Sequence, residues 1–118
     1  MSAPNLLNTT TVTGKTALAS LSTVTSNVIT NSSGSNTVDK LNSISLANYS
    51  SSTVTSNVFI DRSSVKYYLA GNIDIPGYST LVILGKDTSL YLEEGDVLQA
   101  NVSANSSVTV SASYELMS

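Results

Sequence analysis

Hydrophobic and polar residues alternate along most of this chain, with the period of two that is typical of β-strands. The alternation is most regular near the end, where Val108, Val110, Ala112, Tyr114 and Leu116 would share one face. Strands are therefore predicted at 38–49, 53–60, 65–69, 72–75, 80–84, 88–92, 97–102 and 108–117, with two or three more within 9–30. No segment has a helical period, so the sequence predicts an all-β fold.

Two strands carry more detailed expectations. The segment 80–84, TLVIL, is hydrophobic without interruption, and a strand that is hydrophobic on both faces is typically covered on both. We expect it at the centre of the core.

Two further expectations concern other segments. In 65–69, residues Val65, Tyr67 and Leu69 should share a face. Gly14 offers a bend or bulge in the first strands.

Turn residues separate these strands at intervals of about eight to twelve residues, which favours a β-sandwich or barrel of about eight strands. Turns are predicted at 31–36, at 93–96 and at Pro76-Gly77, where a type II turn is expected. The predicted fold is a single antiparallel β-sandwich, jelly-roll-like or else immunoglobulin-like, over 9–118. Residues 1–8 form an extended N-terminal arm, in which Leu6 and Leu7 are the apolar anchor.

A heptapeptide, STVTSNV, occurs twice, at 22–28 and at 52–58. Two copies are too few for a repeat architecture. The two copies reflect either a composition rich in Ser, Thr and Val, or two strands in equivalent positions of the two sheets.

Composition then excludes most chemistry. Charged residues make up 11% of the chain, against roughly 25% in an ordinary soluble domain, and Ser, Thr and Asn take their place. The net charge is −3 and the five cations are dispersed, which argues against nucleic-acid binding. Histidine and cysteine are both absent, so imidazole bases, thiolates and disulfides are unavailable. No signal peptide and no membrane-spanning run is expected, so the chain should fold in a cytosol.

The carboxylates are the remaining candidates for a metal or catalytic site. Asp87, Glu93, Glu94 and Asp96 could form an oxygen cage for Ca²⁺, but they lack the alternating pattern of a dedicated calcium loop, and an acidic turn is typically solvated. Asp61, Asp74 and Glu115 could be nominated as a glycosidase pair, with no feature to single them out. A serine nucleophile would lack a histidine base. No enzyme activity, metal or cofactor is therefore expected.

Six tyrosines supply nearly all the aromatic surface. Tyrosine commonly fills sandwich edges and subunit contacts while its hydroxyl reaches water, although exposed rings could also stack on sugars. Tyr49, where the predicted strand 38–49 meets the following loop, and Tyr78, beside the predicted turn at Pro76-Gly77, are the candidate interface residues.

Two stretches carry a family resemblance. The opening SAPNLLNTTTVTGKTALASLST and the later STLVILGKDTSLYLEEGDVLQANVSANSSVTVSASYE resemble the small virion structural proteins of tailed phages, particularly those of marine cyanobacteria. The resemblance implies a β-sandwich subunit that is made in the host cytoplasm and incorporated into the virion.

The expected function is that of a capsid decoration or cement subunit, whose partners are copies of itself and other virion proteins such as the major capsid protein. The alternatives are a tail, neck or fibre component and a carbohydrate- or receptor-binding module. No nucleic acid and no membrane is expected as a partner.

Overall fold

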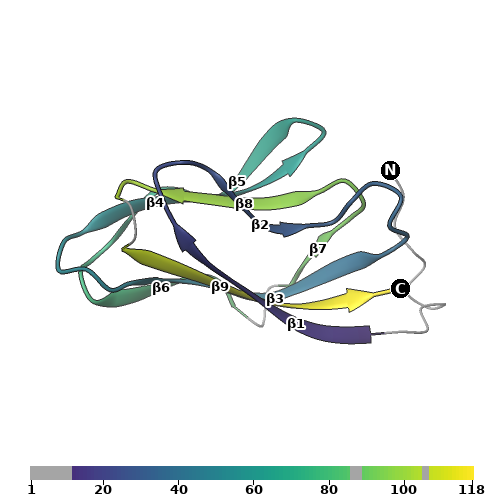
Figure 1. Ribbon diagram of the computed structural model, residues 1–118, viewed down its shortest axis with the longest axis horizontal. Helices are drawn as coiled ribbons and strands as arrows, with labels where there is room; N and C mark the ends of the chain where they lie inside the picture. Colours follow the sequence, from purple (N-terminus) through teal and green to yellow (C-terminus); the bar gives the residue numbers. More distant parts are fainter. Residues whose placement is uncertain (1–11, 86–88, 105–106) are drawn as a thin grey trace.

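The computed structural model describes residues 12–85, 89–104 and 107–118, which form two antiparallel β-sheets stacked in a sandwich-like arrangement (Figure 1). These residues contain nine strands and no helix, so the all-β prediction is confirmed. Within them, no helix long and apolar enough to cross a membrane occurs. The predicted arm at 1–8, with Leu6 and Leu7, lies outside the described residues.

Nine strands make up the two sheets. The first sheet contains β1 (Val12–Leu21), β9 (Val108–Met117), β3 (Val38–Asn48) and β6 (Ser79–Leu84) in that order, with β7 (Leu90–Leu92) also paired to β3. The second sheet contains β2 (Ser26–Thr30), β8 (Val97–Val102), β4 (Val54–Arg62) and β5 (Val65–Ile75) in that order.

The first half of the chain pairs with the second half in reverse order. β1 pairs with β9, β2 with β8, β3 with β6 and β7, and β4 with β5. β6 pairs with the second half of β3 and β7 with the first half, so β6 and β7 lie along the same edge of β3. When β6 and β7 are counted together, the described strands occupy eight positions in the sandwich.

The core lies between the sheets and follows the predicted alternation in its central strands. Val108, Val110 and Ala112 of β9 are buried, and so are Ile44 and Leu46 of β3. Leu41 is also fully buried, although it lies three residues from Ile44 and would face outward in a regular strand. The pairing of β3 with β9 shifts by one residue between Leu41 and Ser43, so β3 contains one extra residue there. Because of this shift, Leu41 and Ile44 can both face the core.

The expectation for 80–84 is wrong. β6 is an edge strand that pairs only with β3, and the side chain of Val82 is 62% exposed while Leu84 is buried. Continuous hydrophobicity cannot distinguish a strand covered on both faces from an edge strand with an apolar outer face. The segment therefore adds exposed apolar surface, not a core centre.

The β4–β5 region also differs from the prediction. β5 continues through Gly71 as one strand, with two register shifts against β4, where the sequence predicts two separate strands. Val65 and Tyr67 are exposed, because β5 is the edge of the second sheet and little covers it. A two-residue turn, Ser63-Ser64, with positive φ at both residues joins β4 to β5.

Two smaller expectations also fail. β1 pairs with β9 in unbroken register from Val12 to Leu21, so Gly14 makes neither bend nor bulge. The two STVTSNV copies lead into β2 and β4, which flank β8 in the same sheet and not in the two different sheets.

Candidate functional site

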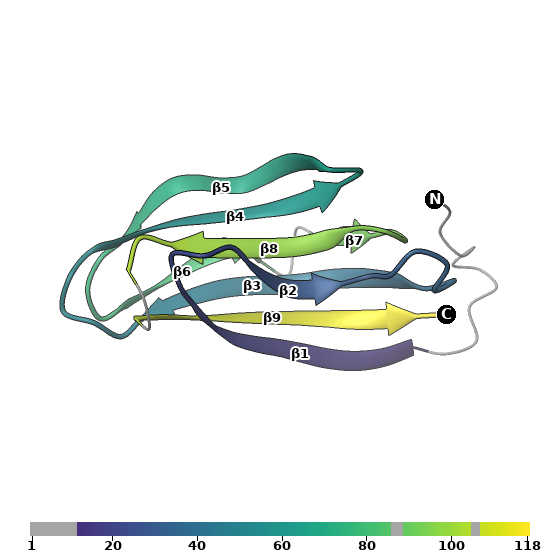
Figure 2. The same cartoon turned by 45° about the horizontal axis from the view of Figure 1, so that its top comes forward.

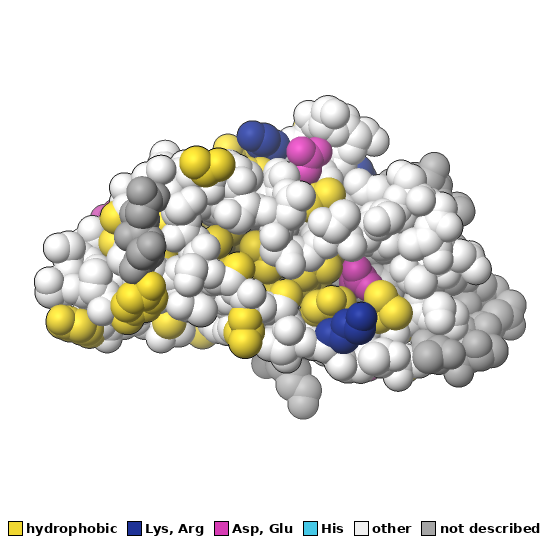
Figure 3. All heavy atoms as spheres, in the orientation of Figure 1, with side chains coloured by type: hydrophobic (Ala, Val, Ile, Leu, Met, Phe, Trp, Pro, Cys, Tyr) yellow, Lys and Arg dark blue, Asp and Glu magenta, His cyan; other side chains and the backbone are white. Residues whose placement is uncertain are grey.

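Four connections gather at one end of the sandwich, which we call the tyrosine end (Figure 1, Figure 2). They are 22–25 between β1 and β2, 49–53 between β3 and β4, 76–78 between β5 and β6, and the described residues 103–104 and 107 between β8 and β9. The sequences of all four contain no charged residue. In Figure 3 this end, on the left, is mostly white and yellow, whereas the blue and most of the magenta side chains lie elsewhere.

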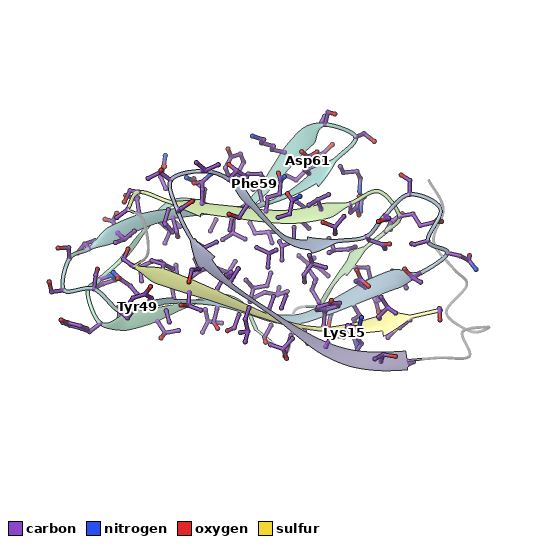
Figure 4. The ribbon with its side chains drawn as sticks, viewed as in Figure 1. Lys15, Tyr49, Phe59 and Asp61 are labelled. Carbon is purple, nitrogen blue, oxygen red and sulfur yellow. The ribbon has the colours of Figure 1, made fainter. Side chains whose placement is uncertain are left out.

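The two predicted interface residues, Tyr49 and Tyr78, both lie at this end, on neighbouring connections. Asn48 and Ser79 form the last pair of the β3–β6 ladder, so each tyrosine is the next residue beyond that pair. The backbone N–H of Tyr78 donates to the carbonyl of Ser50 (3.0 Å). The side chains of Tyr49 and Tyr78 are 53% and 77% exposed, and Figure 4 labels Tyr49 at the extremity of the molecule.

Asn48 fixes both tyrosine connections from inside. Its side chain is almost fully buried, and its Nδ2 donates to the carbonyls of Ser52 (2.8 Å) and Ile75 (2.9 Å). Its Oδ1 accepts hydrogen bonds from the backbone N–H (3.0 Å) and the hydroxyl (2.8 Å) of Ser50. One amide therefore supplies partners to the connection before β4 and to the end of β5. The sequence reasoning missed Asn48, although it falls on the same face of its strand as Ile44 and Leu46.

The backbone around Tyr78 is tightly constrained. A Cβ atom on Gly77 would lie only 2.4 Å from the carbonyl oxygen of Ser51, so no side chain fits there. The expected type II turn is wrong, because the positive φ falls on Tyr78 (57°) and not on Gly77. A left-handed conformation at a bulky residue costs about 1 kcal/mol or more, and such strain is typically found at functional positions.

The acidic turn at 93–96 is a structural junction. Asp96 is fully buried and accepts hydrogen bonds from Arg62 Nε (2.8 Å) and Nη2 (2.6 Å) and from the backbone N–H of Glu93 (2.8 Å). Arg62 also contacts Glu93 (3.2 Å). Hydrogen bonding to Asp96 raises the pKa of the Arg62 guanidinium above its ordinary value. The expectation of a solvated turn is therefore wrong for Asp96.

The same turn offers no cation cage. Glu94 is also buried, and its Oε2 accepts a hydrogen bond from the backbone N–H of Asn36 (3.3 Å). No group of three carboxylates among the described residues is placed to hold a metal ion. Asp87 lies outside the described residues.

The nominated glycosidase carboxylates are not brought together. Glu115 lies in β9 of the first sheet and accepts a hydrogen bond from Asn42 (3.1 Å). Asp61 and Asp74 lie in the second sheet, where Asp74 pairs with Thr55, near the opposite end of β4 from Asp61. No two of them face each other across a cleft in the described part of the chain.

A third titratable cluster lies inside the first sheet. Asp39 is almost fully buried, and its Oδ1 has no hydrogen-bond partner among the residues that the structure describes. Burial raises the pKa of the Asp39 carboxyl, and the positive charge of Lys15 partly offsets this. Burial, together with the charge of Asp39, also raises the pKa of Tyr114. The burial of an ionisable group without a hydrogen-bond partner bears on the stability of the fold.

A second group of exposed aromatic residues lies on β5. Tyr67 and Tyr68 are both exposed, and the ring of Tyr68 packs 5.0 Å from the buried ring of Phe59 (Figure 4). The ammonium group of Lys66 lies 5.0 Å from the centre of the same Phe59 ring. Consecutive residues of a strand face opposite sides, so Tyr67 and Tyr68 do not form one surface.

Comparison with known proteins finds no family model that matches this sequence and no curated protein that matches it. Function is therefore argued from the arrangement of the residues.

Proposed function

We propose that this chain is a structural subunit of a tailed-phage particle, most simply a capsid decoration or cement protein. One observation carries the proposal: the nominated carboxylates that the structure describes are either held in internal contacts or separated, while the large apolar side chains exposed among the described residues lie on edge strands and end loops. Such a chain offers surfaces for contact with neighbours. The resemblance of its two long stretches to phage virion proteins supports the same assignment.

Two exposed edges support assembly with further copies or with a major capsid protein. β1 is a ten-residue edge strand in unbroken register, and long regular edges of this kind readily pair with another chain. β6, the opposite edge of the same sheet, exposes Val82. Covering these edges would stabilise the small core by mass action. The subunit would be made in the host cytoplasm and would reside in the virion.

We further propose the jelly-roll form of the sandwich. The nested pairing of β1 with β9, β2 with β8, β3 with β6 and β7, and β4 with β5 supports it, since a jelly roll has eight strands in two sheets. In an immunoglobulin-like sandwich the first two strands share a sheet, whereas β1 and β2 lie in different sheets here.

Particle incorporation tests the proposed function. The full chain and a variant lacking residues 1–8 would be supplied during infection, and purified particles would be analysed by quantitative mass spectrometry. We expect the full chain in hundreds of copies per particle and the variant to be lost, with the same thermal unfolding for both purified proteins. Far fewer copies would favour a tail, neck or fibre component. Absence from particles, or normal incorporation of the variant, would contradict the decoration proposal with its N-terminal anchor.

A further inference from the structure

We propose that the tyrosine end is a binding site for an uncharged, hydroxyl-rich glycan. The inference goes beyond the function proposed above and does not depend on it, because the isolated chain would bind the glycan whether or not it belongs to a particle. It is carried by the juxtaposition of Tyr49 and Tyr78 on constrained connections that are free of charge.

The two rings present the kind of surface that a pyranose ring fits. Tyr49 and Tyr78 leave the backbone from neighbouring positions, and more than half of each side chain is exposed. A tyrosine offers a flat apolar face and a hydroxyl group at its tip. A sugar ring has an apolar face of C–H groups and a rim of hydroxyls, so it can stack on one ring while hydrogen bonding at its edge.

The connections are held in place before any ligand arrives. Asn48 donates to the carbonyls of Ser52 and Ile75 and accepts from Ser50, and Gly77 packs directly on the backbone of Ser51. Rigid binding loops lose little conformational entropy on binding, which increases affinity without new contacts. This network also holds the backbone of Tyr78 in its left-handed conformation.

The absence of charge selects the chemical class of the ligand. The described residues of these connections are Ser, Thr, Ala, Val, Pro, Gly and Tyr, whose side chains supply hydroxyl groups but no ion. An anionic ligand would lose hydration here without gaining an ionic partner, which is unfavourable. Loops built from Tyr, Ser, Gly and Asn are also the composition with which antibody loops bind by stacking and adaptable hydrogen bonds.

The β5 tyrosines provide the contrast. Tyr67 and Tyr68 lie on opposite faces of an edge strand and next to the charged Lys66. They share the ring chemistry of Tyr49 and Tyr78 but do not lie on neighbouring, uncharged connections. They therefore serve as matched controls.

The test uses the purified full chain and three probes: dextran and laminarin, which are neutral glucans, and alginate, which is anionic. Binding would be followed by NMR shifts of backbone amides and by calorimetry. We expect a neutral glucan to bind, with shifts concentrated in 49–53 and 76–80. Tyr49→Ala and Tyr78→Asn should each weaken binding about tenfold, as expected for loss of one aromatic contact. Asparagine is chosen at position 78 because it tolerates the left-handed backbone.

Two further variants separate ring chemistry from loop placement. Gly77→Ala keeps both tyrosines but forces the backbones of Gly77 and Ser51 apart, so it should also weaken binding. Tyr67→Ala should leave binding unchanged, and thermal unfolding of every variant would show that it is folded. The proposal is overturned if no neutral glucan binds at millimolar concentrations of sugar units, if alginate binds more tightly, or if Tyr67→Ala is as damaging as Tyr49→Ala. Capture of a particle protein through Tyr49 and Tyr78 without any glycan binding would also overturn it.

Discussion

Three buried polar residues organise the ends of the sandwich. Asn48 connects the tyrosine loops, and Asp96 connects Arg62 with the β7–β8 turn. Asn31 plays the corresponding part beside that turn, where its Nδ2 donates to the carbonyls of Thr37 (3.0 Å) and Leu92 (2.9 Å). Buried backbone groups in connections need hydrogen-bond partners, and these short side chains supply them where no strand can.

The Arg62–Asp96 pair yields a prediction about stability. Arg62→Met should lower the free energy of unfolding by about 3 kcal/mol, because it leaves the fully buried carboxylate of Asp96 without its cation. Adding Asp96→Asn to this variant should restore part of the loss, since a neutral amide is less costly to bury and can still accept from Glu93. Urea unfolding at pH 7 measures both steps. Further destabilisation by the second change would show that the carboxylate is not the source of the cost.

Asp39 yields a prediction about pH. Because burial raises its pKa, the folded chain retains this proton to a higher pH than the unfolded chain does, where a carboxyl titrates at roughly pH 4. The free energy of unfolding should therefore fall as pH rises from the unfolded pKa through the folded one. Asp39→Asn removes the loss of stability that ionisation of Asp39 causes, so the variant should unfold at a higher temperature than the parent at pH 7.

Measurement at two pH values distinguishes this effect from a general change in packing. Both proteins carry a neutral group at position 39 at pH 3, so their difference in unfolding temperature should be smaller there than at pH 7. An equal difference at the two values would argue against a titration of Asp39.

At the scale of the element, alternation alone predicts most strands, and the exceptions have a common cause. β8 and β9 have neighbours on both sides, and their buried residues follow the alternation of their own sequences. β3 and β4 also have neighbours on both sides, but register shifts interrupt their alternation, so Leu41 and Phe59 are buried as well. β5 and β6 lie at edges, and the exposure of Tyr67 and Val82 depends on which strand ends the sheet. Strand order is a non-local property that a period of two does not contain.

The candidate site also combines features that the local sequence predicts with features that depend on strand pairing. Tyr49 and Tyr78 could be predicted as loop residues, because turn-forming residues surround both of them. Their meeting could not be predicted, since it requires β3 to pair with β6 across about thirty residues of sequence. Asn48 was missed for the same reason: its partners Ser52 and Ile75 come from separate segments.

The β4–β5 turn yields a prediction at this scale. Ser63 and Ser64 have φ of 54° and 64°, which defines a two-residue turn with left-handed backbone at both positions. Glycine adopts this conformation without the steric cost that a Cβ imposes, so Ser64→Gly should raise the free energy of unfolding by about 1 kcal/mol. Ser64→Ala is the matched control and should not stabilise, because alanine keeps the Cβ. Urea unfolding of the three proteins measures the difference, and equal stabilisation by alanine would exclude this explanation.

At the scale of the whole molecule, the sandwich is elongated, 48 × 26 × 20 Å, and its two ends differ in chemistry. The tyrosine end has neutral connections, while the opposite end contains the Arg62–Asp96 junction. This difference between the two ends follows from the nested pairing, which returns the chain to the same end at every second connection. The uncharged connections of the tyrosine end can bind a neutral partner, and Asp74, which pairs with Thr55 near this end, is an anion that would repel an anionic one.

The nested pairing also predicts the order of folding. Closing β4 against β5 requires only a two-residue turn, whereas pairing β1 with β9 brings Val12 to Met117 across nearly the whole described chain. The entropy of loop closure increases with the length of the loop, so the innermost pair should form early and the outermost pair late.

Stopped-flow kinetics can test this order with two substitutions. Ser64→Gly acts at the innermost turn, so most of its stabilisation should appear as faster folding. Leu21→Ala removes a buried side chain at the end of β1 and should cost about 2–4 kcal/mol, appearing mainly as faster unfolding because β1 joins after the transition state. If Ser64→Gly instead slows unfolding while Leu21→Ala slows folding, the outer pair forms first, and the chain closes from its ends toward its middle.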